Sequence, residues 1–566
     1  MRCVFIAIAA QWQLLSANDV FESNFRVVSS SQTTALKLGL RVTPSQLRDG
    51  EDLKVQWNKN FSWSLLDFIS ITCGPQQNDG DFLFKVYVVR YSYHNTVVFY
   101  RQIMLRCDYV VRYHHFSLFQ FGYHVIDKVV VKMKESFNTP KQGHLSFTSL
   151  WNEMVVMFNS DSNATEPMVR YGLSREALDR YASGTWTTYE AKDMCHRPAT
   201  IVSQWRFRNP GFMHKVIMSD LHSGTRYYYQ FGNDVIGWSR IGSFISRPER
   251  EIENVKFIAY GDMGGFMYQS AEWTAKRVFD DIRQGFNNFL LHVGDISYAT
   301  GCGFQWDQFM HMIEPIATSV PYLVSVGNHE HDYNRGGRTH DPSGAVGYDD
   351  GMDFQPSWGN YKSDSSGECS VPLYHRFHAP GNGRGVFWYS FDYGPIHIVQ
   401  ISSEHNWRRN SEQYKWIEKD LKQVNRSATP WIVLTSHRMM YTTQGGEAED
   451  LVMSFHLRME LEDLLFKYKV NLVITGHQHS YERTCRVRRG LCLNEEEQGP
   501  VHVVVGTAGA SLEKYGFSSS IGKWSVSHTV DWGYLRFTVT TQRMQMQFVL
   551  SRTGDVFDQV DILPWK

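Results

Sequence analysis

The 566-residue chain lacks an excess of charge of either sign. It carries 57 lysine and arginine residues against 58 aspartate and glutamate residues, so its formal net charge at pH 7 is −1. Proteins that bind nucleic acid usually carry a basic excess or a basic stripe that attracts the phosphate backbone, and the sequence contains neither. We therefore expect no nucleic-acid partner.

The chain also lacks a long apolar run. Beyond the N-terminus, no segment approaches the roughly 20 apolar residues that a membrane-spanning helix needs, so we expect no membrane span. The N-terminus, MRCVFIAIAAQWQLLSA, has one basic residue, a short apolar run and a candidate cleavage site at 15–17. This pattern predicts a secretory signal peptide over residues 1–17, with a hydrophobic N-terminal strand as the alternative. The expected location is secreted or extracellular, or a lysosome- or vacuole-like compartment.

Cysteine is scarce, with eight in the whole chain. Removal of Cys3 with the signal peptide leaves an odd number, so at least one thiol is expected to be free or paired between chains. Cys485 and Cys492 flank a short basic turn and are expected to close a hairpin. Cys73 with Cys107 is the second expected pair, and the other cysteines stay unassigned.

Three Asn-X-Ser/Thr triplets are present, and such triplets are the acceptors of N-linked glycans in secreted proteins. They begin at Asn60, Asn163 and Asn425. Each triplet alone is a weak signal, since triplets of this kind also arise by chance.

The pattern of the sequence changes along the chain. Residues 18–145 and 146–250 contain short alternating strand-like runs separated by turns, so both are expected to be all-β, the second as a fibronectin- or immunoglobulin-like sandwich. Residues 251–500 alternate strand-like and helical segments, which predicts an α/β domain with largely buried strands. Residues 501–566 return to strands. The long segment 335–368 is expected to be a functional or mobile loop.

Two helices of the α/β domain are predicted from the sequence pattern, and one of them also has a predicted N-cap. Residues 411–424, SEQYKWIEKDLKQV, place their apolar residues on one stripe, as a helix does. Asn410 stands at the expected N-cap and Gln413 follows three residues later, which is a capping-box pattern. A further helix is expected over about 449–468.

Polar residues directly follow five of the predicted strands. In α/β sheets, ligands bind beyond the carboxyl ends of the strands. A glycine before the polar residue permits a tight turn and a close approach of the backbone. The motifs at the strand ends are GDMG with Asp262, GDISY with Asp295 and Tyr298, GNHE with Asn328 and His329, SHR with His437 and Arg438, and GHQH with His477 and His479.

These strand ends predict a centre for two metal ions. Four residues are assigned to each ion, with the Asp295 carboxylate shared as a bridge: Asp262, Asp295, Tyr298 and His479 for the first, and Asp295, Asn328, His437 and His477 for the second. A phenolate favours a hard trivalent ion, whereas imidazoles with an amide oxygen suit a softer divalent ion. The expected cofactor is therefore Fe(III) plus a divalent ion, Zn, Fe or Mn.

The motifs GDMG, GDISY, GNHE, SHR and GHQH resemble those of the metallophosphoesterase superfamily. The tyrosine of GDISY and Gly264 in the first motif are similar to the purple acid phosphatases. Cys369 in GECSVP and SEHNW at 403–407 resemble the large plant-type subgroup with an added N-terminal domain. The resemblance covers 146–566, and all seven metal-ligand positions of the family match. It implies an α/β metallophosphoesterase fold, with a two-sheet β core flanked by helices, after the all-β regions.

One departure from the family concerns the proton donor. Well-studied plant members carry a pair of histidines about nine residues after the ligand that corresponds to His437, whereas this chain has MMYTTQGGEAED there, with no histidine. His329, His405 and His331 are the candidate replacements, and a polar loop histidine without a role is the alternative for each. His456 lies in a helical pattern and is expected to pack.

Together with the resemblance, the motifs imply a secreted acid phosphatase. It is expected to hydrolyse phosphate monoesters or phosphoanhydrides by attack of a metal-bound hydroxide. The expected ligand is a small phosphorylated substrate, a phosphomonoester or a nucleotide. Asn328, His329 and Arg438 are expected to contact this ligand, and His329 and His405 are the candidate acids. A structural salt bridge is the alternative for Arg438.

Two other functions stay open at this point. One is a nucleotide pyrophosphatase/phosphodiesterase that uses the same site. The other is a catalytically weak or inactive phosphate-binding homologue, which the missing histidine pair supports and the intact ligand set opposes. The sequence also leaves open a homodimer formed through the β domains.

Overall fold

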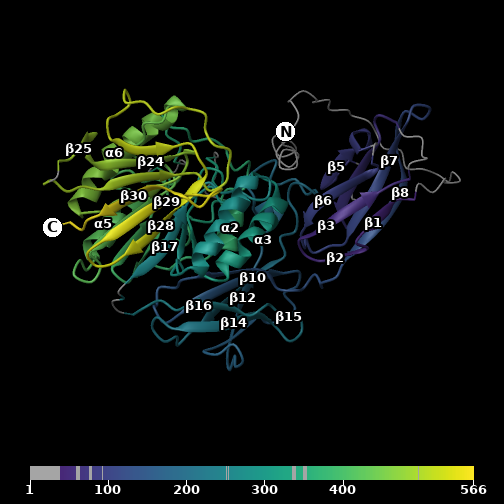
Figure 1. Cartoon of the computed structure of the whole chain (residues 1–566), viewed down its shortest axis with the longest axis horizontal. Coiled ribbons are helices and arrows are strands. Elements are labelled where there is room, and N and C mark those ends of the chain that lie inside the picture. The colour runs from purple at the N-terminus through teal and green to yellow at the C-terminus, as the bar shows by residue number, and fades with distance from the viewer. Residues whose placement is uncertain are drawn as a thin grey trace.

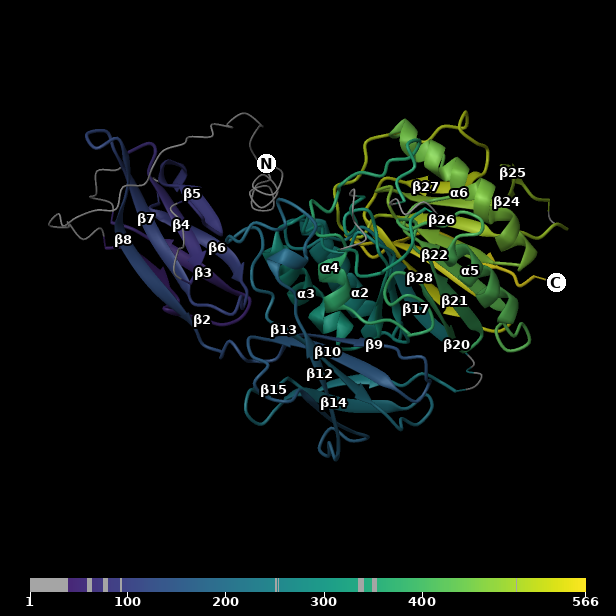
Figure 2. The same ribbon diagram turned by 180° about the vertical axis from the view of Figure 1, so that it is seen from behind.

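The structure is a computed structural model that describes residues 39–58, 64–74, 80–91, 94–249, 252, 254–333, 340–348, 354–494 and 496–565. Within these residues the chain forms two all-β regions and a larger α/β region (Figure 1). The N-terminal β region lies at one end of the molecule, and the view from behind shows the second β region against the α/β region beside α3 (Figure 2). The predicted fold class is confirmed.

Two sheets build the N-terminal region, in the orders β1-β3-β6 and β2-β8-β7-β4-β5. Alternate residues of one central strand point inward: Leu53 and Val55 are buried and Lys54 between them is exposed, as in a sandwich. The strands are β1 (Arg41–Thr43), β2 (Gln46–Leu47), β3 (Glu51–Gln56), β4 (Phe68–Cys73), β5 (Phe84–Tyr87), β6 (Thr96–Gln102), β7 (Tyr109–Ser117) and β8 (Gly122–Met133), with a short 3-10 helix η1 (Val88–Tyr91).

The second region is one eight-stranded antiparallel sheet in the order β15-β14-β11-β12-β13-β10-β9, with β16 beside β14. Its strand β12 pairs with both β11 and β13 and so joins the two halves. The elements are β9 (Lys141–Ser146), β10 (Met154–Ser160), β11 (Met168–Gly172), β12 (Arg180–Thr187), the 3-10 helix η2 (Ala191–Asp193), β13 (Phe212–Met218), β14 (Arg226–Asn233), β15 (Gly237–Trp238) and β16 (Gly242–Ile245).

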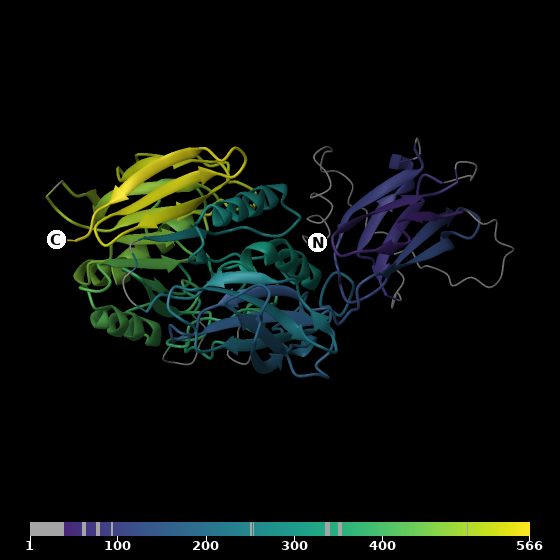
Figure 3. The same ribbon diagram turned by 60° about the horizontal axis from the view of Figure 1, so that its bottom comes forward.

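The α/β region contains two mixed sheets. In Figure 3 the yellow C-terminal strands lie over the green part of the chain at one end of the molecule. The first has the order β19-β18-β17-β28-β29-β30, so the C-terminal strands complete it. Its neighbours β17, β18 and β19 are parallel, and therefore end at the same edge. The strands are β17 (Val255–Tyr260), β18 (Leu290–His292), β19 (Tyr322–Val324), β28 (Gly533–Val539), β29 (Met544–Leu550) and β30 (Val556–Ile562).

The second sheet has the order β20-β21-β22-β23-β26-β24-β25, with β27 beside β24. Its four central strands β21, β22, β23 and β26 are parallel. The strands are β20 (Tyr389–Tyr393), β21 (Ile396–Gln400), β22 (Trp431–Ser436), β23 (Leu472–Thr475), β24 (Tyr481–Arg488), β25 (Leu491–Cys492), β26 (Val501–Val505) and β27 (Ser525–Thr529).

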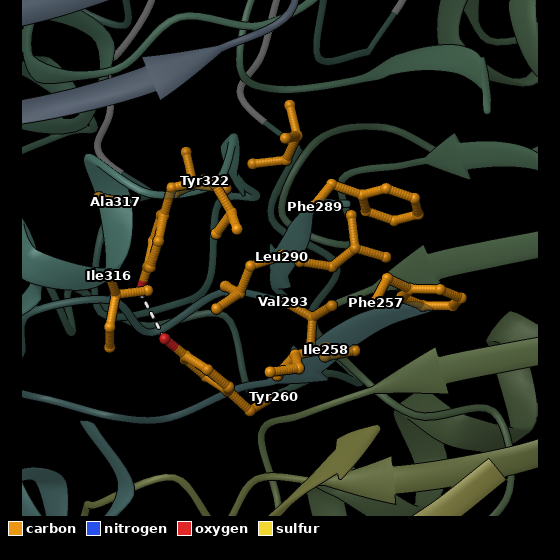
Figure 4. Packing of buried hydrophobic residues seen from close by; sticks show 14 of the residues in the cluster. Phe257, Ile258, Tyr260, Phe289, Leu290, Val293, Ile316, Ala317 and Tyr322 are labelled. Carbon is orange, nitrogen blue, oxygen red and sulfur yellow. Dashed lines mark hydrogen bonds between the residues drawn. The ribbon is translucent and has the colours of Figure 1, made fainter. Parts of the chain in front are cut away.

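A single apolar core supports the strand ends of the first sheet. Phe257, Leu290 and Val293 are fully buried, and Tyr260 and Tyr322 share a buried hydrogen bond of 2.9 Å between their hydroxyls (Figure 4). The same cluster of buried residues continues into β10 and β13 of the second β region. The second β region is therefore packed onto the α/β region by a shared core.

Five helices flank the sheets: α2 (Gln269–Arg283), α3 (Gly303–Ala317), α4 (Val371–Arg376), α5 (Glu412–Gln423) and α6 (Ala448–Lys467). The predicted N-cap of α5 is wrong. The cap is Ser411, whose Oγ accepts the Tyr414 N–H at 3.1 Å, while Asn410 has a left-handed φ of 69° outside the helix. Gln413 forms no capping box, because its amide turns inward and bonds both backbone groups of Ser402.

Three disulfides lie in the described residues. Cys73–Cys107 and Cys485–Cys492 are the two predicted pairs, and Cys195–Cys369 joins the second β region to the segment before α4. No cysteine in this part of the chain is free, so the expectation of a free thiol is not met there. That expectation depended on removing Cys3, which lies outside the described residues.

Several sequence predictions concern termini and modification. The predicted signal peptide and Asn60 lie outside the described residues, whereas Asn163 and Asn425 are exposed residues in loops. Over the ranges that the structure describes, no helix is long and apolar enough to cross a membrane. The predicted domain boundaries stay predictions.

Candidate metal centre

The seven predicted ligand residues come together where the two sheets of the α/β region present their strand ends. They follow β17, β18, β19, β22 and β23 in the segments that the sequence predicted. All seven have buried or half-buried side chains. The strands are parallel neighbours within each sheet, so their carboxyl ends bring residues distant in sequence to one place.

One group of donors surrounds the hydroxyl of Tyr298. This hydroxyl lies 3.1 Å from Asp262 Oδ1 and 2.8 Å from His479 Nε2. The same nitrogen of His479 lies 3.3 Å from Asp262 Oδ1. Phenol, carboxylate and imidazole therefore face one point, as the assignment to the first ion requires.

The second group surrounds the side-chain oxygen of Asn328. His437 Nε2 and His477 Nδ1 each lie 2.9 Å from Asn328 Oδ1. His437 Nε2 is also 3.3 Å from Asp295 Oδ1. Asp295 additionally forms a compact group with Asp262 and His479, whose ligand atoms all lie within 4.8 Å of one another. Asp295 thus belongs to both groups, as expected of a bridge.

The backbone at the centre is held in a conformation that L-residues rarely adopt. Asp262, Asp295, Tyr298 and His477 have φ values of 62°, 50°, 50° and 69°. Such left-handed residues cost roughly 1–3 kcal/mol each and cluster at functional sites. The surrounding core holds the backbone in this conformation. The conformation in turn directs the four side chains into the centre.

Glycines before the ligands are required by close packing. A Cβ on Gly476 would lie 2.3 Å from Asp262 Oδ2, and a Cβ on Gly327 would lie 2.2 Å from Asp295 Oδ1. No larger residue fits at either place without displacing a donor. The sequence prediction that these glycines permit close approach is confirmed.

Each histidine of the centre is oriented through its other ring nitrogen. His437 Nδ1 lies 3.0 Å from the Val293 carbonyl oxygen, and His479 Nδ1 lies 2.6 Å from the Ser511 carbonyl oxygen. His477 Nε2 lies 3.1 Å from the Asp450 carboxylate. Outer hydrogen bonds of this kind fix the tautomer and the ring orientation of metal-binding histidines.

The electrostatics of the centre are those of anionic and imidazole donors packed together. Burial disfavours the charged imidazole of His437, but Asp295 and Asp262 outweigh it and raise its pKa to about 10. Burial also opposes the charge on His479, yet the hydrogen bond and charge of Asp262 raise the pKa to about 9. Burial, followed by Asp262 and Asp295, raises the pKa of Tyr298 well above its usual value.

The donor set fits two metal ions. Ligand atoms about 2.0–2.1 Å from one ion lie roughly 2.8–3.4 Å apart for octahedral to tetrahedral angles. The separations within both groups, 2.8–3.3 Å, fall in this range. Among the contacts of the described residues, no lysine or arginine reaches Asp262 or Asp295. Buried carboxylates without such a partner are typical of metal sites.

His329 lies beside the predicted bridge. Its backbone N–H donates to Asp295 Oδ1 at 2.9 Å, and its Nε2 is 3.8 Å from Asp295 Oδ2. The ring contacts Tyr298 with centroids 4.5 Å apart, and the side chain is 27% exposed. His329 is therefore next to the donors and open to solvent, in a position to reach a ligand.

Arg438 is engaged elsewhere. Its side chain is fully buried, and its Nε donates to both carboxylate oxygens of Glu404, at 2.9 and 3.1 Å. Burial opposes the charge on Glu404, but Arg438 outweighs it and lowers the pKa to about 2. This geometry favours the structural salt bridge, which was the alternative for Arg438, over contact with the substrate.

The other candidate histidines lie outside the centre. The contacts of His405 in the described part of the chain run to Ser402, Asp341, His331 and the rings of Phe387 and Trp388, with no member of the seven ligands among them. His456 stacks on Trp358 with ring centroids 3.6 Å apart, consistent with the packing role expected for it.

Three carboxylates at the centre were not identified from the sequence. Asp450 bonds His477, and Asp364 accepts the Asn328 amide N–H at 3.0 Å. Glu513, whose pKa burial raises, donates its backbone N–H to the His479 carbonyl at 3.2 Å. Asp450 lies in MMYTTQGGEAED itself, the segment in which the expected histidine pair is missing. The acidic run at its end was the only sequence signal for it.

Comparison with known proteins supports these observations along most of the chain. Residues 140–246 match the family described as purple acid phosphatase, N-terminal domain. Residues 213–481 match the calcineurin-like phosphoesterase family, and residues 499–559 match the iron/zinc purple acid phosphatase-like protein C family.

Several plant proteins are similar to this chain. An Arabidopsis thaliana protein named "Probable inactive purple acid phosphatase 9" is 35% identical, over 75% of this chain and 67% of that protein. A Hordeum vulgare protein named "Nucleotide pyrophosphatase/phosphodiesterase" is 31% identical, over 57% of this chain and 88% of that protein. The solved purple acid phosphatase PPD1 from yellow lupin seeds matches with a TM-score of 0.75 and 27% identity, covering 93% of this chain and 95% of that structure.

Proposed function

The chain belongs to the purple acid phosphatase family, and from this premise we propose that it hydrolyses phosphate monoesters or phosphoanhydrides as a binuclear metal-dependent acid phosphatase. The observation that carries the proposal is the convergence of four oxygen donors and three imidazoles from five strand ends. A site of this composition has no evident structural purpose, because buried carboxylates and strained backbones cost stability.

We assign Fe(III) to the group that includes Tyr298 and a divalent ion, Zn, Fe or Mn, to the group that includes Asn328. The phenol is the hard donor, and the amide with two imidazoles is the softer set. When bound, two such ions would acidify a water and neutralise the charge on the phosphoryl oxygens. The chain's part is to hold the donors rigidly, through the outer hydrogen bonds to each imidazole.

His329 is the group we assign to the substrate. Its side chain is 27% exposed and its Nε2 lies 3.8 Å from Asp295 Oδ2, whereas its Nδ1 is buried without a hydrogen-bond partner among the described residues. An imidazole in this position can donate a hydrogen bond to a phosphate oxygen or a proton to the leaving oxygen. Asn328 lies beside it as a second predicted contact. Catalysis by His405 and substrate contact by Arg438 stay predictions without a supporting contact.

A secreted location is part of the proposal. The three disulfides of the described residues support it, because disulfides persist in oxidising compartments. Exposure of Asn163 and Asn425 leaves both sequons accessible to glycosylation.

Two alternatives follow from the relatives' names. The barley protein is named a nucleotide pyrophosphatase/phosphodiesterase, which supports a phosphodiester or nucleotide substrate at this centre. The Arabidopsis protein is named probably inactive, which agrees with the missing histidine pair. The first alternative changes only the substrate, whereas the second removes the reaction and leaves the metal centre.

The test is a visible spectrum of the purified full-length chain together with hydrolysis assays at pH 5. We expect a tyrosinate-to-Fe(III) absorption band that Tyr298→Phe abolishes. The matched control is Tyr268→Phe, which removes a neighbouring phenol whose ring lies 5.9 Å from that of Tyr298 and should leave the band in place.

The substrates are p-nitrophenyl phosphate, bis-p-nitrophenyl phosphate and a nucleoside diphosphate sugar. Faster turnover of the monoester supports the phosphatase, and faster turnover of the other two supports the phosphodiesterase. The band without turnover of any substrate would establish the inactive alternative. Absence of both iron and the band would overturn the Fe(III) assignment.

A further inference from the structure

A second cluster of metal-binding side chains lies apart from the seven ligands. His331 lies in the segment after β19, Asp341 lies in the described segment 340–348, and His405 lies in the segment after β21. One ligand atom from each lies within 4.8 Å of the other two. We propose that these three residues form an additional binding site for a zinc-type divalent cation.

The separation of two of these atoms is that of metal ligands. His405 Nε2 and Asp341 Oδ2 are 3.3 Å apart. A charge-assisted hydrogen bond between such groups is usually about 2.7–2.9 Å long. Two ligands about 2.0–2.1 Å from a tetrahedral zinc ion lie about 3.3 Å apart. The pairs His437–Asp295 and His479–Asp262 of the first centre show the same 3.3 Å.

Each of the three residues is hydrogen-bonded to a serine. His331 Nδ1 lies 3.2 Å from Ser370 Oγ, and His405 Nδ1 lies 2.7 Å from Ser402 Oγ. Ser343 donates its backbone N–H to Asp341 Oδ1 at 2.8 Å and its hydroxyl to Oδ2 at 2.6 Å. Hydrogen bonds of this kind orient ligands in metal sites, and they leave the Nε2 atom of each histidine as the nitrogen available for an ion.

The surroundings also favour a cation. Rings enclose the cluster: Phe387 and Trp388 pack on His405, and Tyr333 packs on His331. The Asp341 side chain is only 12% exposed, and its one ion-pair contact among the described residues is with His405, not with a lysine or arginine.

Two histidines and one carboxylate form a common zinc donor set with an open position. An ion here would fasten the segment 340–348 to the loops after β19 and β21. The loop after β19 also carries His329, two residues before His331. The additional site would therefore hold in place the loop that carries His329, without contacting the seven candidate ligands of the first centre.

The test counts metal ions in the full-length chain after removal of metals and reloading with iron and zinc. We expect three ions per chain in the natural protein and two in Asp341→Asn, with the tyrosinate band retained in the variant. The matched control is Asp420→Asn, which breaks a similar histidine–aspartate contact, His397 Nε2 to Asp420 Oδ2 at 2.9 Å. The other carboxylate beside His397, that of Asp392, lies at the opposite ring nitrogen, so these three side chains do not converge on one point. This control should keep three ions.

Diffraction from crystals of the zinc-loaded protein at the zinc edge gives a second measurement that needs no variant. An anomalous peak bounded by His331, Asp341 and His405 would support the proposal. Peaks at Asp295 without one at this cluster would overturn it and leave only a hydrogen bond between His405 and Asp341. A peak at the cluster without any at Asp295 would instead contradict the proposed function and leave the additional site intact.

Discussion

The two sheets of the α/β region contribute different kinds of donor to the metal centre. The sheet that contains β17, β18 and β19 supplies only oxygen donors, from Asp262, Asp295, Tyr298 and Asn328. The sheet that contains β22 and β23 supplies only imidazole nitrogens, from His437, His477 and His479. Neither sheet alone offers both kinds of donor, so the centre exists only where the sheets meet.

The two sheets also position each other's donors. His437 follows β22, but its Nδ1 bonds the carbonyl oxygen of Val293, which directly follows β18 in the other sheet. In return, the backbone N–H of His477 donates to Asp262 Oδ2 at 3.0 Å. The geometry of the centre therefore depends on how the sheets dock. We call the sheet with β17, β18 and β19 the oxygen side and the sheet with β22 and β23 the nitrogen side. Substitutions on the two sides should have different effects on metal binding, and the predictions below test this.

The largest effect is expected on the oxygen side, from Asp295→Asn. Asp295 belongs to both groups of donors, and burial of its charge is offset by His437 and His329, which keep its pKa well below the usual value. Loss of this charge should release both ions and lower activity by at least about 10³-fold, more than the 10–100-fold typical of removing an outer hydrogen bond. Metal content and kcat/KM measure the result.

Asp420→Asn is the control for Asp295→Asn, because it removes a half-buried carboxylate of α5 that lies outside the centre. It should leave metal content and activity unchanged. Retention of one ion by Asp295→Asn would show that the carboxylate does not bridge the two groups.

The nitrogen side should make metal binding strongly dependent on pH. In the metal-free chain the pKa values of His437 and His479 are about 10 and 9, so both imidazoles carry a proton at pH 7 that an ion must displace. Below about pH 8, two displaced protons lower the apparent affinity by about 100-fold per pH unit. Calorimetry in two buffers of different ionisation enthalpy should count at least two protons released per chain, with Tyr298 as the source of a third.

The stability of the metal-free chain should have the opposite dependence on pH. Because the folded-state pKa values of both histidines are raised, their contribution to the free energy of unfolding is fully present below about pH 6.5 and is lost as the pH rises through 9 and 10.

The count of released protons can also contradict the proposal. Release of fewer than one proton on metal binding would contradict the assignment of both imidazoles as ligands.

The sequence was sufficient to predict that the seven candidate ligand residues come together, because each follows a short apolar strand, usually after a glycine. Parallel strands bring such positions to one edge whatever the details of the loops. The glycines were informative because a side chain at Gly476 or Gly327 would strike a donor. The same local reasoning failed at α5, where Ser411 instead of Asn410 caps the helix, since tertiary bonds to Ser402 draw Gln413 inward.

What the sequence did not predict depends on segments that only the fold brings together. Asp450 opens α6 and Glu513 follows β26, and neither occupies a position that a strand end would indicate. Cys195–Cys369 spans 174 residues, so spacing gave no reason to pair them. The cluster of His331, Asp341 and His405 likewise joins three separate loops.

An intermediate effect is expected from Asp450→Asn, which removes a charge that orients the nitrogen side. Burial raises the pKa of Asp450, but His477 outweighs it and lowers the value to about 2, so the carboxylate is charged at every relevant pH. Weaker orientation of His477 should lower the affinity for the divalent ion by about 10–100-fold and leave the tyrosinate band in place. A calorimetric titration with zinc measures the change in affinity.

Asp463→Asn is matched to Asp450→Asn, since it removes a carboxylate of the same helix whose side chain is 50% exposed and pairs with Arg488 and Arg489. It should not alter zinc affinity. Loss of the tyrosinate band in Asp450→Asn would show that the effect is not confined to the nitrogen side.

The smallest effect separates a histidine outside the candidate metal centre from the three histidines proposed as ligands. His397 lies within β21 of the same sheet, between Asp392 and Asp420, at 2.6 and 2.9 Å. Burial opposes its charge, but the hydrogen bonds to both carboxylates raise its pKa to about 9. A rise from 6.5 to about 9 corresponds to at most about 3 kcal/mol. Screening at the exposed Asp392 reduces this, so we expect about 2 kcal/mol.

Because the folded-state pKa of His397 is raised, this stabilisation is fully present below about pH 6.5 and is lost as the pH rises through about 9. His397→Gln should therefore lower the free energy of unfolding at pH 6 and change it little at pH 10, as denaturant titrations can measure. Its metal content and its proton release on metal binding should equal those of the natural protein. In the control His456→Gln, burial lowers the imidazole pKa, so the difference between pH 6 and pH 10 should have the opposite sign. An equal loss at both pH values in His397→Gln would mean that its imidazole contributes packing and no charge.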